Sequence, residues 1–445
     1  MTTGAPTGLL IRFALPMLVG NIFQQLYNLV DSVIVGRFVG AEALAAVGST
    51  ASITFFFFAL CNGIGNGGGI VTSQRFGTGD KSGVKSCITN VAYLMTGVSV
   101  VVGILAFFLS RPLLNLLGTP SEIISDALNY LRLQCVGVIF IALYNYSANM
   151  LRALGDSRTP LYFLIFSCIL NAILDLLFVC VIHMGVFGAA LATVIAQFLA
   201  GSLCLFFAFR TNEYFDLSRE DFAPSKEIIG RASALGIPIS MQFALIALST
   251  MALQRVVNGF GAVAVAAFTA TSRIEQLIHQ PYQTLGASLA TFCGQNYGAK
   301  KTGRVISGFH RGVVIMFIFS ALMLPIMQFF GDSIVRIFVE DAAVIAMGSE
   351  ALRITSWFYA FLGIIYVTRG VLNGIGDAFF ALLNGIVEIL CRLLIPLPMT
   401  SIPALGVWGI WWSVGVTWAI SAITALMRYV FVRKKRDLHE KSAEP

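Results

Sequence analysis

The sequence predicts an all-α polytopic membrane protein with twelve transmembrane helices, arranged as two duplicated six-helix lobes around a central cavity. Two observations lead to this fold class. Apolar residues make up 57% of the 445 residues and charged residues only 11%, whereas soluble domains carry roughly 25% charged residues. The second observation is that the two halves of the chain repeat the same pattern at one constant spacing.

The repeat becomes visible when the second half is aligned with the first at an offset of 221 residues. Gly155-Asp156 then meets Gly376-Asp377, and Gly185-Val186-Phe187-Gly188 meets Gly406-Val407-Trp408-Gly409. Units of solenoid proteins run about 20–50 residues, so a unit of this length is a whole duplicated lobe. Each lobe therefore has the same fold, and a residue that is absent from its twin position needs a separate explanation.

The apolar stretches are long enough to cross a bilayer, which takes about 20 residues in a helix. Six fall in each repeat, and strands are excluded because the alternating pattern of a membrane barrel is absent. The twelve expected spans are 9–36, 48–73, 88–110, 130–153, 160–182, 185–209, 231–257, 268–293, 311–330, 350–373, 378–397 and 405–431.

These spans divide the chain into four parts. We expect an amino-terminal lobe over 1–209, a cytoplasmic linker over 210–230, a carboxy-terminal lobe over 231–432 and a basic cytoplasmic tail over 433–445. The first span is expected to be retained, because Pro16 aligns within one residue with Pro238 of the seventh span. A cleaved signal peptide would have no such twin.

The distribution of positive charge predicts the orientation in the membrane. Most of the 29 Lys and Arg residues fall on the side of the linker and the two termini, including the 75–85 loop, Arg369 and the run from Arg433 to Arg436. Cytoplasmic loops carry such an excess. We therefore expect a multi-pass protein of the cell inner or plasma membrane, with both termini in the cytoplasm.

No pattern typical of an enzyme is present. The four histidines are scattered, the eight cysteines never form CxxC, and the sequence lacks HExxH, GxSxG and a phosphate-binding GKS or GKT loop. The glycine run from Gly63 to Gly69 lies near the end of an apolar span with no strand before it. Close helix packing or a bend explains it better than a nucleotide loop. We predict neither catalysis nor a cofactor.

Polar residues inside the first span form one stripe. Asn21, Gln24, Asn28 and Asp31 are spaced to share a single helical face, and Tyr27 borders it. An Asp at the bilayer centre costs on the order of 3 kcal/mol, so this stripe cannot face lipid. It faces either another helix, as a packing contact, or an aqueous cavity.

Other amino-terminal spans add matching groups. Asn171 and Asp175 lie one turn apart in the fifth span, Thr193 lies in the sixth, and Asn145 and Asn149 lie one turn apart in the fourth. The acids are absent from the second repeat, where Ala252 is the twin of Asp31 and Pro396 that of Asp175. Carboxylate, amide and hydroxyl oxygens are hard ligands, which suit Na⁺ or a shared proton rather than zinc or copper.

The second lobe has membrane charges of its own. Arg273 and Glu275 open the eighth span, and Glu388 and Arg392 lie one turn apart in the eleventh. Opposite charges at this spacing are most simply an internal ion pair. A role in substrate contact or in lobe closure is the alternative.

The residues from Leu15 to Gly48 (LPMLVGNIFQQLYNLVDSVIVGRFVGAEALAAVG), LNAILDLLF from Leu170 and GVFGAALATVIAQ from Gly185 resemble the multidrug and toxic compound extrusion (MATE) transporters. The resemblance covers the whole chain and is strongest to the branch with acids on helices 1 and 5. It implies that Asp31, Asn171, Asp175 and Thr193 couple transport to a cation and form a possible Na⁺ site. Tyr27, Asn28, Asn145 and Gln24 would be accessory residues.

The resemblance implies a secondary antiporter that exports amphipathic or cationic organic compounds in exchange for Na⁺ or H⁺. Its partners would be small organic substrates and the lipid bilayer, with no nucleic acid, and we expect a monomer. A lipid-linked precursor flippase of the same superfamily is the nearest alternative, although such proteins tend towards a strongly basic cavity. A polytopic membrane enzyme or a receptor explains the acids and the duplication less well.

Overall fold

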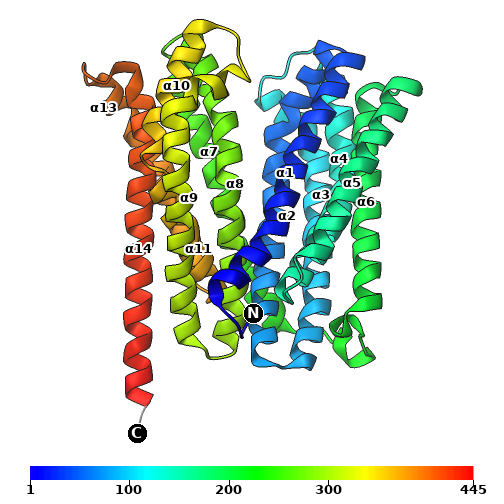
Figure 1. Cartoon of the computed structure of the whole chain (residues 1–445). Coiled ribbons are helices and arrows are strands. Elements are labelled where there is room, and N and C mark those ends of the chain that lie inside the picture. Colours follow the sequence, from blue (N-terminus) through cyan, green and yellow to red (C-terminus); the bar gives the residue numbers. More distant parts are fainter. Residues whose placement is uncertain (444–445) are drawn as a thin grey trace. The chain divides into compact units, whose positions relative to one another are not determined.

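A computed structural model describes residues 1–443, and long helices account for nearly all of them (Figure 1). The helices of the first repeat are α1 (Pro6–Phe38), α2 (Ala41–Thr78), α3 (Lys81–Leu116), α4 (Ile124–Ala153), α5 (Arg158–Asp175), the π-helical η1 (Leu176–Val181) and α6 (Gly185–Thr211). The short 3₁₀ turns η2 (Glu213–Phe215) and η3 (Arg219–Phe222) follow. The second repeat contains α7 (Lys226–Asn258), α8 (Ala262–Gly298), α9 (Thr302–Arg336), α10 (Ala342–Ser356), α11 (Tyr359–Gly374), α12 (Phe379–Leu394), α13 (Pro396–Ser401), the 3₁₀ turn η4 (Gly406–Trp408) and α14 (Gly409–Ala443).

The predicted fold class is confirmed. Among the described residues, ten helical segments are long and apolar enough to cross a membrane, and the bent pair α10–α11 forms an eleventh span. The remaining span is α8, which has 37 residues but carries Arg273, Glu275 and His279. The expected span 350–373 differs in detail, because α10 and α11 meet at an angle of 54°. The tail expected at 433–445 continues α14 as far as Ala443, and residues 444 and 445 lie outside the described part.

The chain forms two compact units whose boundaries fall inside helices. The amino-terminal unit contains Arg12–Ser240, and the carboxy-terminal unit contains Met241–Pro445 together with Met1–Ile11. The first turns of α1 therefore belong to the carboxy-terminal unit, and the first turns of α7 belong to the amino-terminal unit. Both boundaries lie close to a proline inside the helix, Pro16 in α1 and Pro238 in α7.

The glycine run of α2 lets the start of α7 pack directly against it within the amino-terminal unit. A Cβ added at Gly67 would lie 2.5 Å from the carbonyl oxygen of Ala232 and from the amide nitrogen of Gly236. A Cβ added at Gly236 would in turn lie 2.7 Å from the Cα of Ile64. Small residues allow two backbones to approach this closely. The glycines thus serve helix packing, as the sequence pattern indicated.

The linker that leads into α7 lies along the start of α3. Lys81 forms an ion pair with Glu213 at 2.8 Å, and the side chain of Asn90 holds the linker backbone at Ala223 and Ser225. The Ser218 backbone N–H donates to Asp221, and this hydrogen bond holds the pKa of that carboxyl below its usual value. The linker is therefore an ordered strap built from short 3₁₀ turns.

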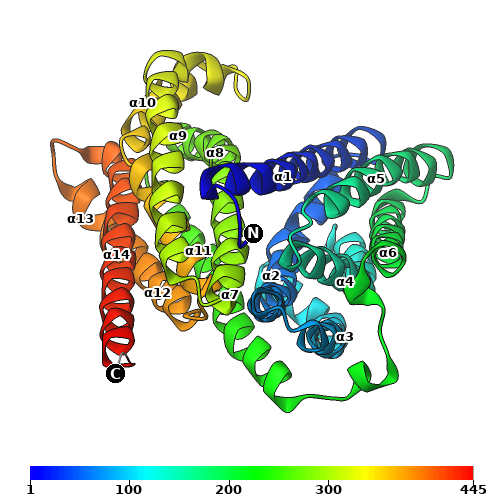
Figure 2. The ribbon, with the colours of Figure 1, turned by 60° about the horizontal axis from the view of Figure 1, so that its bottom comes forward.

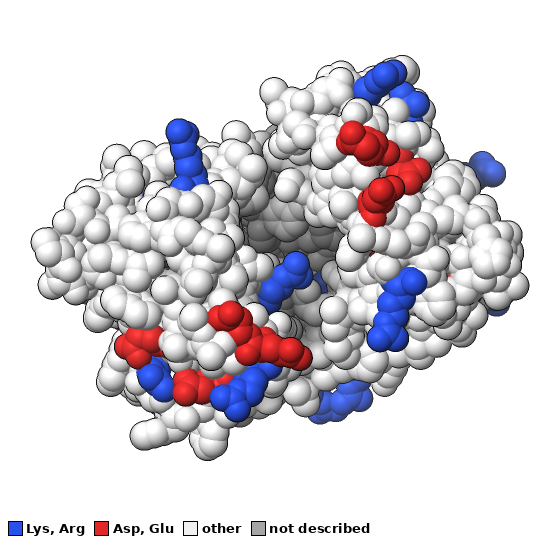
Figure 3. All heavy atoms as spheres, turned by 90° about the horizontal axis from the view of Figure 1, so that it is seen from above, with Lys and Arg blue, Asp and Glu red and all other residues white. Residues whose placement is uncertain are grey.

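Within the carboxy-terminal unit, Met1 and the last turns of α14 lie at the same end (Figures 1 and 2). The first residues of the chain are held there by the α8–α9 connection: the Arg304 guanidinium donates to the Gly4 carbonyl oxygen at 3.0 Å, and the Lys301 ammonium donates to that of Thr2 at 3.0 Å. The opposite end, where α10 begins, is seen from above in Figure 3. The surface in that view, which includes residues of both units, is mostly uncharged, with acidic side chains in groups and basic ones scattered.

The packing of α2 against α7 predicts that Gly67→Ala will lower the thermal stability of the purified protein, because the new Cβ overlaps backbone atoms that cannot move aside. Gly48→Ala on the same helix is the matched control, since a Cβ there meets no atom within 4 Å. That control should be neutral or stabilising by up to about 1 kcal/mol, because Ala favours a helix more than Gly does. Equal melting temperatures for the two variants would contradict the close packing.

Candidate functional site

The two predicted acids meet inside the amino-terminal unit. Asp31 lies in the last third of α1, Asp175 is the final residue of α5, and their carboxyl groups are hydrogen bonded to each other. Asp175 is fully buried and Asp31 is half-buried. A hydrogen bond between two carboxyl groups needs a proton on one of them, and like charges this close resist ionising together.

A network of Asn171, Thr193 and Tyr27 lies beside this pair, and Tyr27 is close to both acids. The amide of Asn171 donates to Thr193 Oγ1 at 3.3 Å, and Thr193 in turn donates to the Ala189 carbonyl oxygen at 3.1 Å. Tyr27 Oη lies 3.1 Å from the same Oγ1. Because the only hydroxyl proton of Thr193 goes to Ala189, Tyr27 is the donor to Thr193. The network thus joins α1, α5 and α6 through one threonine oxygen.

The backbone changes its form at the site. The α-helical pattern of α5 ends at Asp175, and the next six residues, Leu176–Val181, form a π-helical turn. Such turns are rare and frequently occur at functional sites. The second repeat departs from the α-helix at the same place, since α12 ends at Leu394 and α13 begins at Pro396, the twin of Asp175. Both lobes therefore interrupt this helix, but only the first places an acid there.

The accessory residues differ in their placement. Tyr27 belongs to the network through Thr193, as described above. Gln24 on α1 and Asn145 on α4 are half-buried, whereas Asn28 is exposed and its backbone carbonyl accepts a hydrogen bond from Ser32. The accessory roles of Gln24, Asn28 and Asn145 remain predictions.

The sequence reasoning missed Tyr130 on α4. Its ring lies close enough to Asp31 and Asp175 to feel both charges, and its hydroxyl group is hydrogen bonded to Gln134 one turn later. A tyrosine in an apolar span resembles ordinary packing, so composition gave no signal. The comparison of the two repeats did give a signal, because the twin of Tyr130 is Ala351 and the tyrosine is therefore confined to the first lobe.

The predicted pair Glu388–Arg392 is present in the carboxy-terminal unit, with Arg392 Nη2 3.1 Å from Glu388 Oε1. The assignment of Arg369 to a cytoplasmic loop was wrong. Arg369 lies within α11, and its side chain is only 8% exposed. Its Nη2 atom lies 3.0 Å from Glu388 Oε2, so one carboxylate holds two guanidinium groups.

Further polar groups complete this second cluster. Arg369 Nε donates to Asn384 Oδ1 at 2.7 Å, and Arg392 Nη1 donates to Thr250 Oγ1 at 3.1 Å. The cluster therefore ties α11 and α12 to α7. Arg273 and Glu275 at the start of the eighth span do not form an ion pair with each other: Arg273 is exposed, and Glu275 is hydrogen bonded to Thr355.

The oxygen atoms in the first cluster are of the chemical kind that binds small hard cations. Two carboxyl groups, a threonine hydroxyl, an amide and a phenol converge there, and Na⁺ and similar ions are bound by oxygen ligands of this kind. Within residues 1–434, whose side chains the structure describes, no group of three or more His, Cys, Asp and Glu side chains could hold a metal ion. The fold and this site define a helical membrane transporter with a buried acid pair.

Comparisons with known proteins give the same class. The MatE family matches residues 16–177 and 238–396, and the chain therefore belongs to this family of MATE membrane transporters. The probable multidrug resistance protein YpnP of Bacillus subtilis is 32% identical over 431 residues, which cover 96% of this chain and 95% of that protein. The multidrug export protein MepA of Staphylococcus saprophyticus is 24% identical, with coverage of 96% and 94%. A crystal structure of MATE in the bent conformation matches with a TM-score of 0.90 and 25% identity, covering 97% of each chain.

The second cluster predicts a specific pattern of stability. Glu388→Gln leaves two buried guanidinium groups uncompensated. The free energy of unfolding should therefore fall by about 3–5 kcal/mol, as is typical when a buried pair is broken. The melting temperature and the protein level in membranes should fall with it. Adding Arg392→Met should restore stability only in part, because Arg369 remains. Adding Arg369→Met as well should restore most of it.

The partly exposed pair Glu350–Arg353 provides the control. Glu350→Gln should change the melting temperature little, because exposed ion pairs contribute about 0–1 kcal/mol. Full recovery with the Glu388→Gln, Arg392→Met double variant would show that Arg369 needs no partner.

Proposed function

We propose that the protein is an antiporter, which exports amphipathic or cationic organic compounds in exchange for Na⁺ or H⁺ by alternating access. The observation that supports this most directly is the hydrogen-bonded acid pair Asp31–Asp175, which is confined to one of two similar lobes. The multidrug resistance and multidrug export names of the relatives support the export of drugs.

The geometry suggests how cation binding is coupled to movement. A proton on the acid pair permits the hydrogen bond between Asp31 and Asp175, whereas Na⁺ requires both oxygens to face the ion. The change alters the fit of α1 against α5, and the π-helical turn after Asp175 offers a place where the register can shift. A cation drives transport only if its affinity differs between the two states. We propose that the shared contacts of Tyr27, Asn171 and Thr193 make the affinity for the cation differ between these two states.

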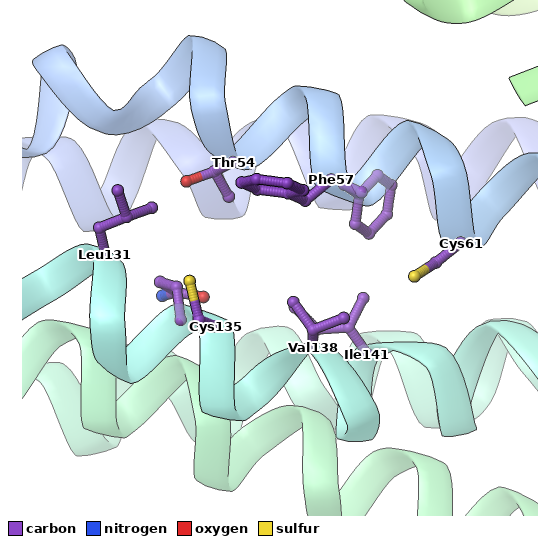
Figure 4. Close-up of a pocket in the computed structure, with 9 residues that line it drawn as sticks. Thr54, Phe57, Cys61, Leu131, Cys135, Val138 and Ile141 are labelled. Atoms are coloured by element: carbon purple, nitrogen blue, oxygen red, sulfur yellow. The ribbon is translucent and has the colours of Figure 1, made fainter. Parts of the chain in front are cut away.

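An apolar pocket of about 20 Å³ in the same unit offers room for a small apolar group of the substrate. It lies between α2 and α4 and is lined by Thr54, Phe57, Phe58, Cys61, Leu131, Gln134, Cys135, Val138 and Ile141 (Figure 4). Gln134 lines the pocket and is also hydrogen bonded to Tyr130, which faces the acids. We propose that this pair of residues relays the state of the acid pair to the apolar part of the substrate.

A lipid-linked precursor flippase remains the alternative. Such a carrier has to attract the pyrophosphate of its substrate, which favours unpaired cationic groups. Glu388 partly neutralises Arg369 and Arg392, and the first cluster is acidic, so an organic cation fits these residues better than a pyrophosphate does.

The proposal predicts that Asp31→Asn and Asp175→Asn will each reduce drug efflux to the level of cells without the transporter. Both variants keep the size of the side chain and remove the ionisable group, so protein levels should persist. The double variant should lose no more than either single one if one cation serves both acids. Ethidium efflux, measured in a strain that lacks its own pumps, with and without Na⁺, tests this and identifies the coupling ion.

The matched control for these variants is Asp126→Asn, which changes an exposed acid in the first turn of α4. It should leave efflux unchanged. Wild-type efflux in either acid variant, at equal protein level, would refute the assignment of the coupling site.

The charge distribution predicts a cytoplasmic linker and an external α9–α10 connection. Glu220→Cys and Glu340→Cys introduce thiols at exposed positions of these two segments. In a background that lacks the native cysteines, an impermeant maleimide should label Cys at 340 in intact cells and Cys at 220 only after permeabilisation. The reverse pattern would invert the orientation.

A further inference from the structure

The start of α9 carries an open groove that has a covered counterpart in the first lobe. The groove is lined by Gly303, Ile306, Ser307, His310, Arg311 and Val314. Subtracting the offset of 221 residues from the last four gives Ser86, Thr89, Asn90 and Tyr93 on α3. Three of these α3 residues, Thr89, Asn90 and Tyr93, hold the linker by hydrogen bonds to Asp221, Ala223 and Phe222.

The two faces differ in exposure and in charge. Thr89 and Asn90 are 3% and 0% exposed, because the linker covers them, whereas His310 and Arg311 are exposed. Within residues 1–434, whose side chains the structure describes, no acidic side chain forms an ion pair with Arg311. The linker that covers the first face brings acidic residues, of which Glu213 binds Lys81. At the matched positions the second face thus carries the positive charge of Arg311 where the first face has the neutral Asn90, and the linker covers the first face alone.

The surroundings of the groove are those of a membrane interface. Further along α9 the exposed residues are apolar, with Phe317 and Ile318 each 63% exposed and Leu322 59% exposed. Ile306 also lines a second groove between α9, α11 and α14, which is formed by Val305, Val371, Ile375, Tyr429 and Val432 and has Arg433 at its edge. Basic groups beside exposed apolar side chains match a phospholipid, whose anionic headgroup and acyl chains need both.

We propose that this groove, defined by Ser307, His310 and Arg311, is a binding site for an anionic phospholipid. The phosphate accepts hydrogen bonds from Arg311, His310 and Ser307, and the acyl chains lie along Phe317 and Ile318. The lipid takes the place on α9 that the linker takes on α3. It covers the second lobe with a molecule from the membrane where the first lobe uses its own chain.

The experiment uses the full-length protein in a neutral detergent and counts bound phosphatidylglycerol by native mass spectrometry, with phosphatidylcholine as the comparison lipid. The test variant is His310→Thr with Arg311→Asn, which installs the residues that the first lobe has at these positions. Its affinity for phosphatidylglycerol should fall roughly fivefold, the effect expected from removing the permanent positive charge of Arg311. Binding of phosphatidylcholine should not change.

The matched control is Arg336→Asn, which removes an exposed arginine from the other end of α9. It should retain the binding of phosphatidylglycerol at the groove. If both variants lost phosphatidylglycerol binding equally, the loss would reflect the net charge of the protein alone, and the proposed site would be wrong. Inorganic phosphate should not compete at millimolar concentration, since the acyl chains contribute to binding. Displacement of the lipid by a peptide with the sequence of residues 213–225 would instead identify the groove as a peptide site. The assay needs no transport, so its outcome is independent of the proposed function.

Discussion

The contact between Asp31 and Asp175 is the constraint on which the amino-terminal unit depends. Two carboxyl groups inside a membrane protein are tolerated only if they share a proton or hold a cation, because an isolated charge at that depth is costly. The polar side chains next to the pair come from α1, α4, α5 and α6. Thr193 links Tyr27 to Asn171, and Tyr130 on α4 lies near both acids. The backbone changes from α-helix to π-helix immediately after Asp175.

The carboxy-terminal unit handles buried charge in a different way. Its arginines Arg369 and Arg392 are permanently charged, and Glu388 lies between them. Such a cluster has little freedom to gain or lose a cation, whereas the acid pair has a proton to exchange. One duplicated fold thus contains a changeable charge site in one half and a fixed one in the other. The proposed ion-driven cycle relies on this difference, because it assigns the response to the ion to the acid pair of the first unit alone.

Much of the fold and the centre of the site could be predicted from the sequence. The apolar spans gave the helices, and the lack of a twin for Asp31 and Asp175 separated these acids from ordinary packing. Arg369 was misplaced because it lies near the end of an apolar stretch, while its partner Glu388 is 19 residues away and on another helix. The π-helical turn and the bend between α10 and α11 arise from backbone hydrogen bonds and tertiary packing. That bend falls at Trp357 and Phe358, so neither a proline nor a glycine marks it in the sequence.

The placement of the unit boundaries inside α1 and α7 has a consequence for the history of the chain. Each half begins its first helix in the unit formed mainly by the other half. In an ancestor one repeat long, the same arrangement would be a pair of subunits that exchange their first helical turns, as in a domain-swapped dimer. Fusing two such genes converts an exchange between molecules into one within a single chain, at a high effective concentration. On this view the linker over 210–230 joins the two fused copies. After the fusion, each copy could lose residues that the other kept.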